Sequence, residues 1–188
     1  MKIKIKRYKK VKSTNDIALR LIKNNNCEPV LITSEKQTRG RGRARKKWVS
    51  KKGNLFISLF FKFDQRKINF EQYAVLNAFL LKKVISKIIS KHIKIKWPND
   101  LLINKKKFCG ILQEVIKFDN FYYLIVGIGL NTNIAPQNKS FKSTSLKNIL
   151  NKKINNKKIL KKIVIAYEKF LKEKNKFSFS DLKRKYRE

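Results

Sequence analysis

Histidine and cysteine are scarce in this chain of 188 residues, and their scarcity limits the chemistry that it can perform. The single histidine, His92, excludes a metal site built from several histidines and disfavours Ser–His or Cys–His catalysis. The two cysteines, Cys27 and Cys109, provide no disulfide framework and are typical of a reducing cytoplasm. We therefore look for a function that needs neither a catalytic histidine nor a disulfide scaffold.

Long apolar runs are also absent. No apolar segment approaches the roughly 20 residues that are needed to span a bilayer. The N-terminus is basic, but no apolar stretch follows it, so the sequence predicts no signal peptide. We therefore expect a cytoplasmic protein that does not bind membranes.

Acidic residues are few: 12 Asp and Glu stand against 48 Lys and Arg, which gives a formal charge of +36. Such a charge ordinarily indicates nucleic-acid binding. The lysines are, however, spread through predicted strands, turns and helices alike, which indicates a general compositional bias. We expect nonspecific adhesion to polyanions at low salt and no specific DNA site.

Apolar residues, in contrast, make up 42% of the chain and include 13 phenylalanines, a composition that argues against general disorder. The length suits one domain with its own core, and neither repeats nor a long linker divide it. We therefore predict a single domain over residues 1–188.

The apolar pattern predicts strands and helices in the order of an α+β fold. Strands are predicted over residues 2–8, 30–34, 54–63, 93–97, 101–103, 108–116 and 121–128. A first helix begins at Ser13, with Asp16 completing a capping box. A core helix covers residues 70–90, and an apolar stripe from Leu160 to Leu171 predicts a late helix. Because the strands are grouped between helices, alternating βαβ units are disfavoured.

The segment from Gln37 to Trp48 carries the strongest functional signal. Gly40 and Gly42 let backbone N–H groups turn inward, and Arg41 and Arg43 place planar, permanently charged forks beside that turn. Such a loop can bind an anion. The alternative is a flexible Arg-Gly segment that binds RNA weakly, and the loop by itself does not decide between them.

Three further segments combine with this loop. Lys96-Trp97-Pro98-Asn99-Asp100 joins two strands, with Pro98 forcing an extended bend. Lys105-Lys106-Lys107-Phe108-Cys109-Gly110 enters the next strand. Gly127-Ile128-Gly129-Leu130-Asn131 ends the following one, where glycines allow a ligand to approach the backbone. Each motif is weak alone, whereas their order and spacing together are specific.

With Ser13-Thr14-Asn15 and Ser143-Thr144-Ser145-Leu146, these motifs resemble the catalytic domain of biotin protein ligases over roughly residues 13–150. The resemblance implies a mixed sheet flanked by helices and a two-step reaction. Biotin and ATP, with Mg²⁺, would give biotinyl-5′-adenylate and pyrophosphate. The biotinyl group would then pass to a lysine of a biotin carboxyl carrier protein, an acetyl-CoA carboxylase subunit. A homodimer is one oligomeric state that this reading leaves open.

The resemblance also implies roles for individual residues. Those implied for biotin are Ser13, Thr14, Asn15, Gln37, Gly40, Arg41, Gly42, Arg43 and Lys107. Those implied for ATP are Arg41, Trp48, Lys96, Asn99 and Asn131. The catalytic residues would be Arg43, Lys96 and Lys107. Asp100 is the candidate metal ligand, with a turn-capping carboxylate as an equal alternative.

The residues present suit this chemistry. A carboxylate that attacks an α-phosphate needs no catalytic histidine or cysteine; it needs cations that hold two anions together and stabilise the developing charge. The loop from Gly40 to Trp48 would close over the adenylate and exclude water.

The sequence departs from the family in three ways. Ala44-Arg45 stands where the loop usually has its second glycine, which predicts a stiffer and more cationic loop. We expect no DNA-binding winged helix before the catalytic domain. We also expect no C-terminal β-barrel domain, and the lack of this domain would reduce activity.

Two other functions compete with this one. Lipoate or octanoate ligases and transferases share the fold and rank second, because the Gly-Arg loop paired with Lys96-Trp97-Pro98-Asn99-Asp100 is the biotin pattern. A basic nucleic-acid-binding module would explain the charge but not the ordered motifs.

Overall fold

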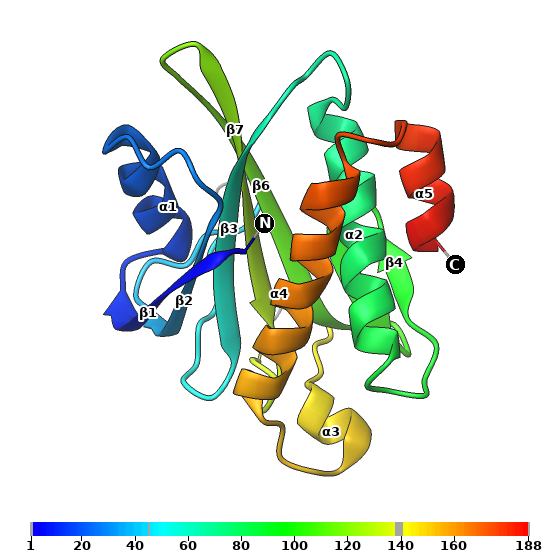
Figure 1. Cartoon of the computed structure of the whole chain (residues 1–188). Helices are drawn as coiled ribbons and strands as arrows, with labels where there is room; N and C mark the ends of the chain where they lie inside the picture. The colour runs from blue at the N-terminus through cyan, green and yellow to red at the C-terminus, as the bar shows by residue number, and fades with distance from the viewer. Residues whose placement is uncertain (1, 45, 138–140, 188) are drawn as a thin grey trace.

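The computed structural model describes residues 2–44, 46–137 and 141–187. Within these ranges, seven strands form one sheet and five helices accompany it (Figure 1). The strands are β1 (Lys4–Val11), β2 (Val30–Gln37), β3 (Leu55–Phe63), β4 (Lys94–Lys96), β5 (Asp100–Ile103), β6 (Lys106–Phe118) and β7 (Phe121–Leu130). The helices are α1 (Thr14–Lys23), α2 (Phe70–Ser86), α3 (Leu146–Leu150), α4 (Asn156–Glu173) and α5 (Phe179–Arg187). No helix in the described ranges is long and apolar enough to cross a membrane.

The sheet is mixed, with the strand order β1-β2-β3-β7-β6-β5-β4. β1 runs parallel to β2, and α1 forms the crossover between them. The other neighbouring strands are antiparallel. β6 and β7 form a long hairpin whose last pair is Phe118 with Phe121, and its turn, Asp119-Asn120, lies within the turn predicted at residues 117–120. The α+β class is therefore confirmed, with a single βαβ unit at one edge.

Alternation along the strands divides the apolar side chains between two cores. On β3, Leu59 and Phe61 belong to the larger core, whereas Phe60 between them belongs to the smaller one. Because successive side chains of a strand point to opposite faces, these two cores lie on opposite faces of the sheet. α1 supplies Ala18 and Ile22 to the smaller core, while α2, α4 and α5 pack on the other face (Figure 1).

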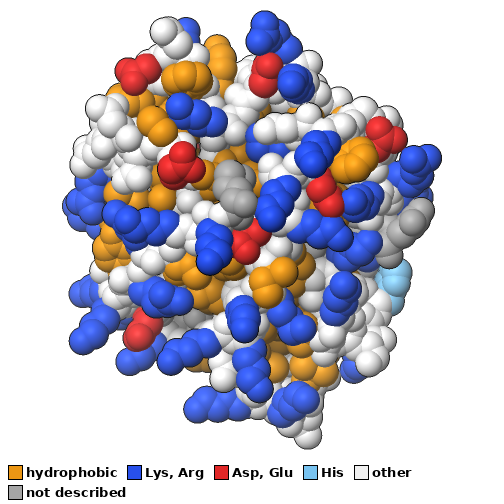
Figure 2. Space-filling model, viewed as in Figure 1, with side chains coloured by type: hydrophobic (Ala, Val, Ile, Leu, Met, Phe, Trp, Pro, Cys, Tyr) orange, Lys and Arg blue, Asp and Glu red, His pale blue; other side chains and the backbone are white. Residues whose placement is uncertain are grey.

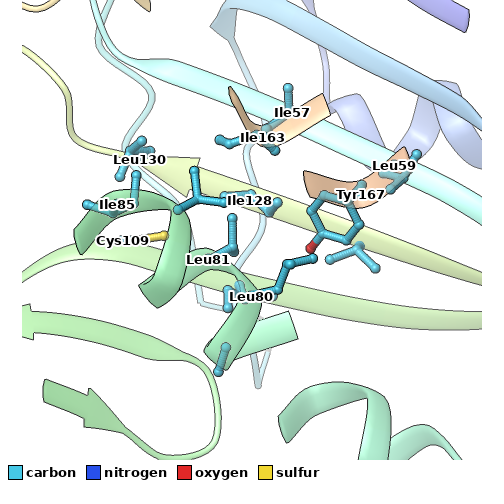
Figure 3. Packing of buried hydrophobic residues seen from close by; sticks show 14 of the residues in the cluster. Ile57, Leu59, Leu80, Leu81, Ile85, Cys109, Ile128, Leu130, Ile163 and Tyr167 are labelled. Carbon is cyan, nitrogen blue, oxygen red and sulfur yellow. The ribbon is translucent and has the colours of Figure 1, made fainter. Parts of the chain in front are cut away.

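The larger core confirms the prediction of a buried helix after residue 70. α2 begins with a capping box in which Asn69 accepts from the backbone of Gln72 and the Gln72 side chain accepts from the Asn69 N–H. Figure 3 shows Leu80, Leu81 and Ile85 of α2 facing α4 and the strands. The polar Asn77 is also buried there, and its Oδ1 accepts from Tyr167 Oη at 2.8 Å, so the amide oxygen is satisfied.

Several local predictions were wrong, for identifiable reasons. Ser13 precedes α1 as predicted, but its side chain makes no capping bond, and the Asp16 carboxylate contacts Arg41. α2 ends at Ser86, four residues before the predicted end. α3 and α5 were not predicted: α3 is only five residues long, and α5 buries only Leu182 and Tyr186.

The charge is distributed as the sequence indicated, at least on the face that Figure 2 shows. Lysine and arginine side chains are interspersed there with apolar and uncharged ones over many elements. They form no single continuous stripe on this face, so the fold gives no support to a dedicated nucleic-acid groove there.

Candidate functional site

A cavity of about 830 Å³ lies at the N-terminal end of α1, on the face of the sheet that α1 partly covers. Gly127 and Gly129 of β7 alternate with core-facing residues and so fall on the same face as Tyr123 and Ile125 of the smaller core. At these two glycines β7 itself contributes no side chain to this face of the sheet. The cavity therefore exists because α1 covers only part of this face and the exposed strands bear glycines.

Most of the predicted site residues meet in this cavity, although they come from distant parts of the chain. Its lining includes Ser13, Thr14, Asn15, Gln37, Arg41, Gly42, Arg43, Trp48, Lys96, Asn99, Asp100 and Lys107. Two predicted residues, Gly40 and Asn131, are not part of the lining. A Cβ on Gly40 would lie 2.7 Å from both Ser50 Oγ and Trp48 O, so this glycine is needed for packing beneath the loop. Asn131 is buried, and its Nδ2 donates to the carbonyl of Thr144 at 3.2 Å.

One end of the cavity is built from uncharged hydrogen-bonding groups. Gln37 Oε1 accepts from the backbone N–H of Thr14 at 2.8 Å and from its hydroxyl at 3.0 Å. Ser58 donates to Thr14 Oγ1 at 2.7 Å or to Asn15 Oδ1. These contacts fix the side chains before any ligand binds, as a site that recognises neutral polar groups requires.

Gly127 makes room for this polar end. The carboxamide of Asn15 lies directly over Gly127, and a Cβ there would collide with it. Ser58, opposite Gly127 in the sheet, completes the contact from β3. Glycine at position 127 is therefore required by a close approach and not by an unusual backbone conformation.

The Gly-Arg loop is a small hairpin that folds over the cavity. The N–H of Gly42 donates to the carbonyl of Lys46 at 2.7 Å, and the N–H of Trp48 donates to that of Gly40 at 2.9 Å. Arg41 and Lys47 pair as an isolated antiparallel bridge. The loop is thus ordered by its own backbone bonds, unlike the flexible Arg-Gly segment that was the alternative.

Ala44 stands at the tip of this hairpin with φ of 51°, in the left-handed region that favours glycine. A non-glycine residue in this region costs roughly 1–2 kcal/mol. The predicted departure at Ala44-Arg45 therefore coincides with backbone strain at Ala44, while Arg45 lies outside the described residues.

Trp48 covers a patch of sheet that has no side chains. Gly110 and Gly129 are cross-strand partners on β6 and β7, and the indole lies against both. A Cβ on Gly110 would lie 2.7 Å from the indole, and one on Gly129 would come closer still. Lys107 Nζ is 5.2 Å from the centre of the Trp48 ring, on the side of the cavity that carries the cations.

The opposite end of the cavity is cationic, and Lys107 is its most enclosed charge. Lys107 Nζ lies 2.6 Å from Asp100 Oδ1, and the two side chains are only 16% and 18% exposed. Phe141 approaches the same ammonium, with its ring centre 5.2 Å away. Arg43 and Lys96 line this region from exposed positions. Burial raises the pKa of the neighbouring Cys109 thiol to about 12, so Cys109 stays protonated and provides no nucleophile.

The two arginines of the loop have different surroundings. The guanidinium of Arg41 contacts Asp16 and lies 2.9 Å from both carboxylate oxygens of Glu114. Burial by itself would lower the pKa of Arg41, but the charge and hydrogen bonds of Glu114 and Asp16 outweigh it and raise the pKa. In the part of the chain that the structure describes, Arg43 takes part in no ion pair.

Sequence reasoning missed Ser58, Glu114, Asp16 and Phe141 as parts of the site. The sequence did carry a signal for Ser58, because it is the one hydroxyl inside the apolar run of β3. The structure shows that Ser58 is fully buried. The sequence signal for Glu114 was weaker: it is one of only 12 acidic residues in a chain of charge +36, and it lies within a strand. Phe141 lies in an irregular segment, where no periodicity indicates which way a side chain points.

Comparison with known proteins identifies the family to which the chain belongs. A profile of the Biotin/lipoate A/B protein ligase family matches residues 8–131. The chain therefore belongs to the biotin/lipoate A/B protein ligase family.

Biotin ligases are among the proteins that this chain resembles. The bifunctional ligase/repressor BirA of Bacillus subtilis is 33% identical over 177 residues, which are 91% of this chain and 54% of the relative. The biotin–[acetyl-CoA-carboxylase] ligase of Mycobacterium tuberculosis is 28% identical over 143 residues, 73% of this chain and 52% of the relative. The chain thus spans about half the length of these relatives.

A solved structure gives the same result for the fold. The biotin protein ligase of Aquifex aeolicus, in complex with biotin and ATP, matches with a TM-score of 0.82 and 30% identity. The match covers 97% of this chain and 76% of that one. The mixed sheet with flanking helices that the resemblance implied is therefore confirmed.

Proposed function

We propose that this chain activates biotin with ATP to form biotinyl-5′-adenylate and pyrophosphate, and then transfers the biotinyl group to a lysine of a carrier protein. The observation that carries the proposal is the division of the cavity. Its α1 end presents a preorganised network of uncharged polar groups, its β5–β6 end presents Lys107 with Lys96 on the neighbouring strand, and Arg43 of the loop also lines it. This arrangement fits a ligand with a neutral polar head, an apolar body and a carboxylate that must meet a phosphate.

The first step needs positioning and charge stabilisation more than acid–base chemistry. An oxygen of the biotin carboxylate attacks the α-phosphorus, the bond from that phosphorus to the leaving pyrophosphate breaks, and a mixed anhydride forms. Both reactants are anions, so the cations at this end offset their repulsion and stabilise charge in the transition state. Lys107 is the best placed of these, because it is the least exposed and Asp100 fixes its position.

In the second step, the uncharged amine of the carrier lysine attacks the carbonyl carbon of the anhydride. The bond from this carbon to the phosphate oxygen breaks, AMP leaves, and the amine loses a proton as the amide forms. The hairpin from Gly40 to Trp48 contributes by covering the cavity, because water would hydrolyse the same anhydride. The exposed cations Lys46 and Lys47 extend this cover.

Mg²⁺ would accompany ATP, and the cavity offers few protein ligands for this ion. Asp100 is the one carboxylate among the described residues that line the cavity, and no described cluster of three or more His, Cys, Asp or Glu could hold a metal by itself. Mg²⁺ is commonly bound by one or two carboxylates together with substrate phosphates and water. Asp100 would therefore share the ion with the nucleotide, and the ion would offset phosphate charge.

The carrier is inferred from the relatives. Two of them are named as ligases of acetyl-CoA carboxylase, in Mycobacterium tuberculosis and in Paracoccus denitrificans, and we propose the biotin carboxyl carrier protein of that enzyme as the acceptor. A cytoplasmic location, the absence of specific DNA binding and a homodimer remain predictions.

Pyrophosphate release tests the proposal. With Mg-ATP, the purified chain should release pyrophosphate when biotin is added and not when lipoate or octanoate is added. Lys107→Met should abolish most of this activity, whereas Lys106→Met, a neighbouring lysine that is not part of the cavity lining, should leave it unchanged. A response to lipoate or octanoate in place of biotin would assign the chain to the other branch of the family.

A further inference from the structure

The two arginines of the loop, Arg41 and Arg43, make different contacts, and this difference indicates different roles. Arg41 faces two carboxylates, Asp16 on α1 and Glu114 on β6, whereas Arg43 lies exposed at the cavity. The formal charges of Arg41, Asp16 and Glu114 sum to −1, so this cluster does not attract an anion. An incoming phosphate would also have to displace two charge-assisted contacts in order to reach Arg41.

Glu114 also connects the loop to the polar end of the cavity. The same carboxylate that contacts Arg41 accepts a hydrogen bond from Asn15 Nδ2, and Asn15 Oδ1 in turn accepts from Ser58. A continuous series of contacts therefore runs from β3 through α1 and β6 to the loop. Only 12 residues of the chain are acidic, and two of them converge on this one arginine.

We infer that Arg41 anchors the loop to α1 and β6, that Asp16 and Glu114 are positioning residues acting through it, and that Arg43 is left as the loop arginine that contacts the substrate anion. The planar fork of Arg41 suits this role, because it addresses two carboxylates from different elements at once. The anchor holds the first strand of the hairpin, next to Gly40 and Gly42, in the position from which Trp48 reaches the glycine pair. This inference rests on the proposed function only for the identity of the anion.

The anchoring role can be measured without any substrate, by hydrogen exchange of the loop amides. The N–H groups of Gly42 and Trp48 are bonded within the hairpin, so their exchange reports loop opening. Glu114→Gln and Arg41→Met should each accelerate their exchange about tenfold, which corresponds to about 1.4 kcal/mol. Glu71→Gln removes an exposed carboxylate elsewhere and should change nothing, which controls for net charge.

Combining the substitutions tests whether Arg41 and Glu114 act together. If they do, the double variant Arg41→Met with Glu114→Gln should exchange no faster than Arg41→Met alone. Independent, multiplying effects would show that Glu114 acts on something other than Arg41. Unchanged exchange in both single variants, with unfolding midpoints like that of the unsubstituted protein, would overturn the anchor.

ATP binding by calorimetry separates the two arginines. Arg43→Met should weaken ATP binding about tenfold and leave the exchange of Gly42 and Trp48 unchanged. If Arg41→Met weakens ATP binding to the same extent without loosening the loop, Arg41 is itself the ligand and the inference fails. Failure of biotin to elicit pyrophosphate release would refute the proposed function and leave the exchange results standing.

Discussion

The two faces of the sheet differ in packing, although the same strands form both. On the face covered by α2 and α4, side chains from β3, β6 and β7 fill the space almost entirely with apolar groups. On the other face, α1 covers only part of the strands, and the uncovered part carries glycines, the buried serines Ser34 and Ser58, and the cavity. The division occurs within single strands: on β7, Val126 and Ile128 pack into the larger core, while Gly127 and Gly129 lie beneath ligand-binding candidates.

This contrast explains how the fold can be stable and still keep an open cavity. Close packing on one face provides the free energy of folding, so the other face can retain an open cavity, strained Ala44 and unneutralised cations. Substitutions on the first face should therefore change stability with little effect on binding. Substitutions on the second should do the reverse.

The largest effect is expected from the core face. Leu81→Ala should lower the free energy of unfolding by about 3 kcal/mol, because it removes a fully buried side chain and leaves a cavity. Urea unfolding would measure this loss, and the folded protein should still bind biotin normally. Ile165→Ala is the matched control, because Ile165 is 55% exposed and its truncation should cost less than about 0.5 kcal/mol. A cost below 1 kcal/mol for Leu81→Ala would show that this face is loosely packed.

On the cavity face, Arg43→Gly should release the reaction intermediate. Loss of a charge-assisted contact costs roughly 1.5–3 kcal/mol, or about ten- to a hundredfold in retention of the adenylate. Blotting for biotin on a bystander protein, incubated with enzyme, biotin and ATP, should show increased labelling of lysines. Arg39→Gly, an exposed arginine outside the cavity lining, should not increase it. Equal bystander labelling together with lost biotin affinity would place Arg43 in the biotin pocket instead.

Gly129→Ala should displace Trp48 with little loss of stability. The new Cβ would collide with the indole, so we expect about a tenfold loss of ATP affinity. In a Trp97→Phe background Trp48 is the single tryptophan, and its emission should shift to longer wavelength as the indole leaves the sheet. Val126→Ala, on the opposite face of the same strand, should reduce stability without this shift. An unchanged emission in Gly129→Ala would show that the glycine pair does not seat Trp48.

The smallest effect returns to the packed face, where Glu173 of α4 joins α5. Burial alone would raise its pKa, but hydrogen bonds from Lys185 at 2.7 Å and Tyr186 at 2.8 Å lower it. Because folding lowers this pKa, the ionised Glu173 stabilises the folded protein. This stabilisation is complete at pH values above the unfolded pKa near 4.5 and is lost as the pH falls through the folded pKa. Glu173→Gln should cost about 1 kcal/mol at pH 7 and progressively less below pH 4.5. A difference that persists unchanged at pH 3 would exclude this ionisation as its cause.

The sequence alone determined the elements with strong periodicity and the motifs with fixed spacing. The strands of residues 54–63 and 121–128 and the core helix after residue 70 follow from local apolar patterns, which need no knowledge of neighbours. The Gly-Arg loop and the Lys96–Asp100 motif indicated the site through their residue types, which are also a local property of the sequence. Their residue types fit only a few chemical uses, so most of the residues that they nominated do line the cavity.

Only the tertiary structure decided which of these residues face one another. The sequence showed Asp16 as a helix cap, but folding brings it to Arg41, 25 positions away, and adds Glu114 from a strand 73 positions from that arginine. It likewise nominated Gly40 and Asn131, and the tertiary structure leaves both out of the cavity lining. Strand pairing sets the position of Gly110 opposite Gly129 and so makes the surface for Trp48. Such contacts depend on sheet order and register, which arise from long-range packing and are not encoded in any local pattern.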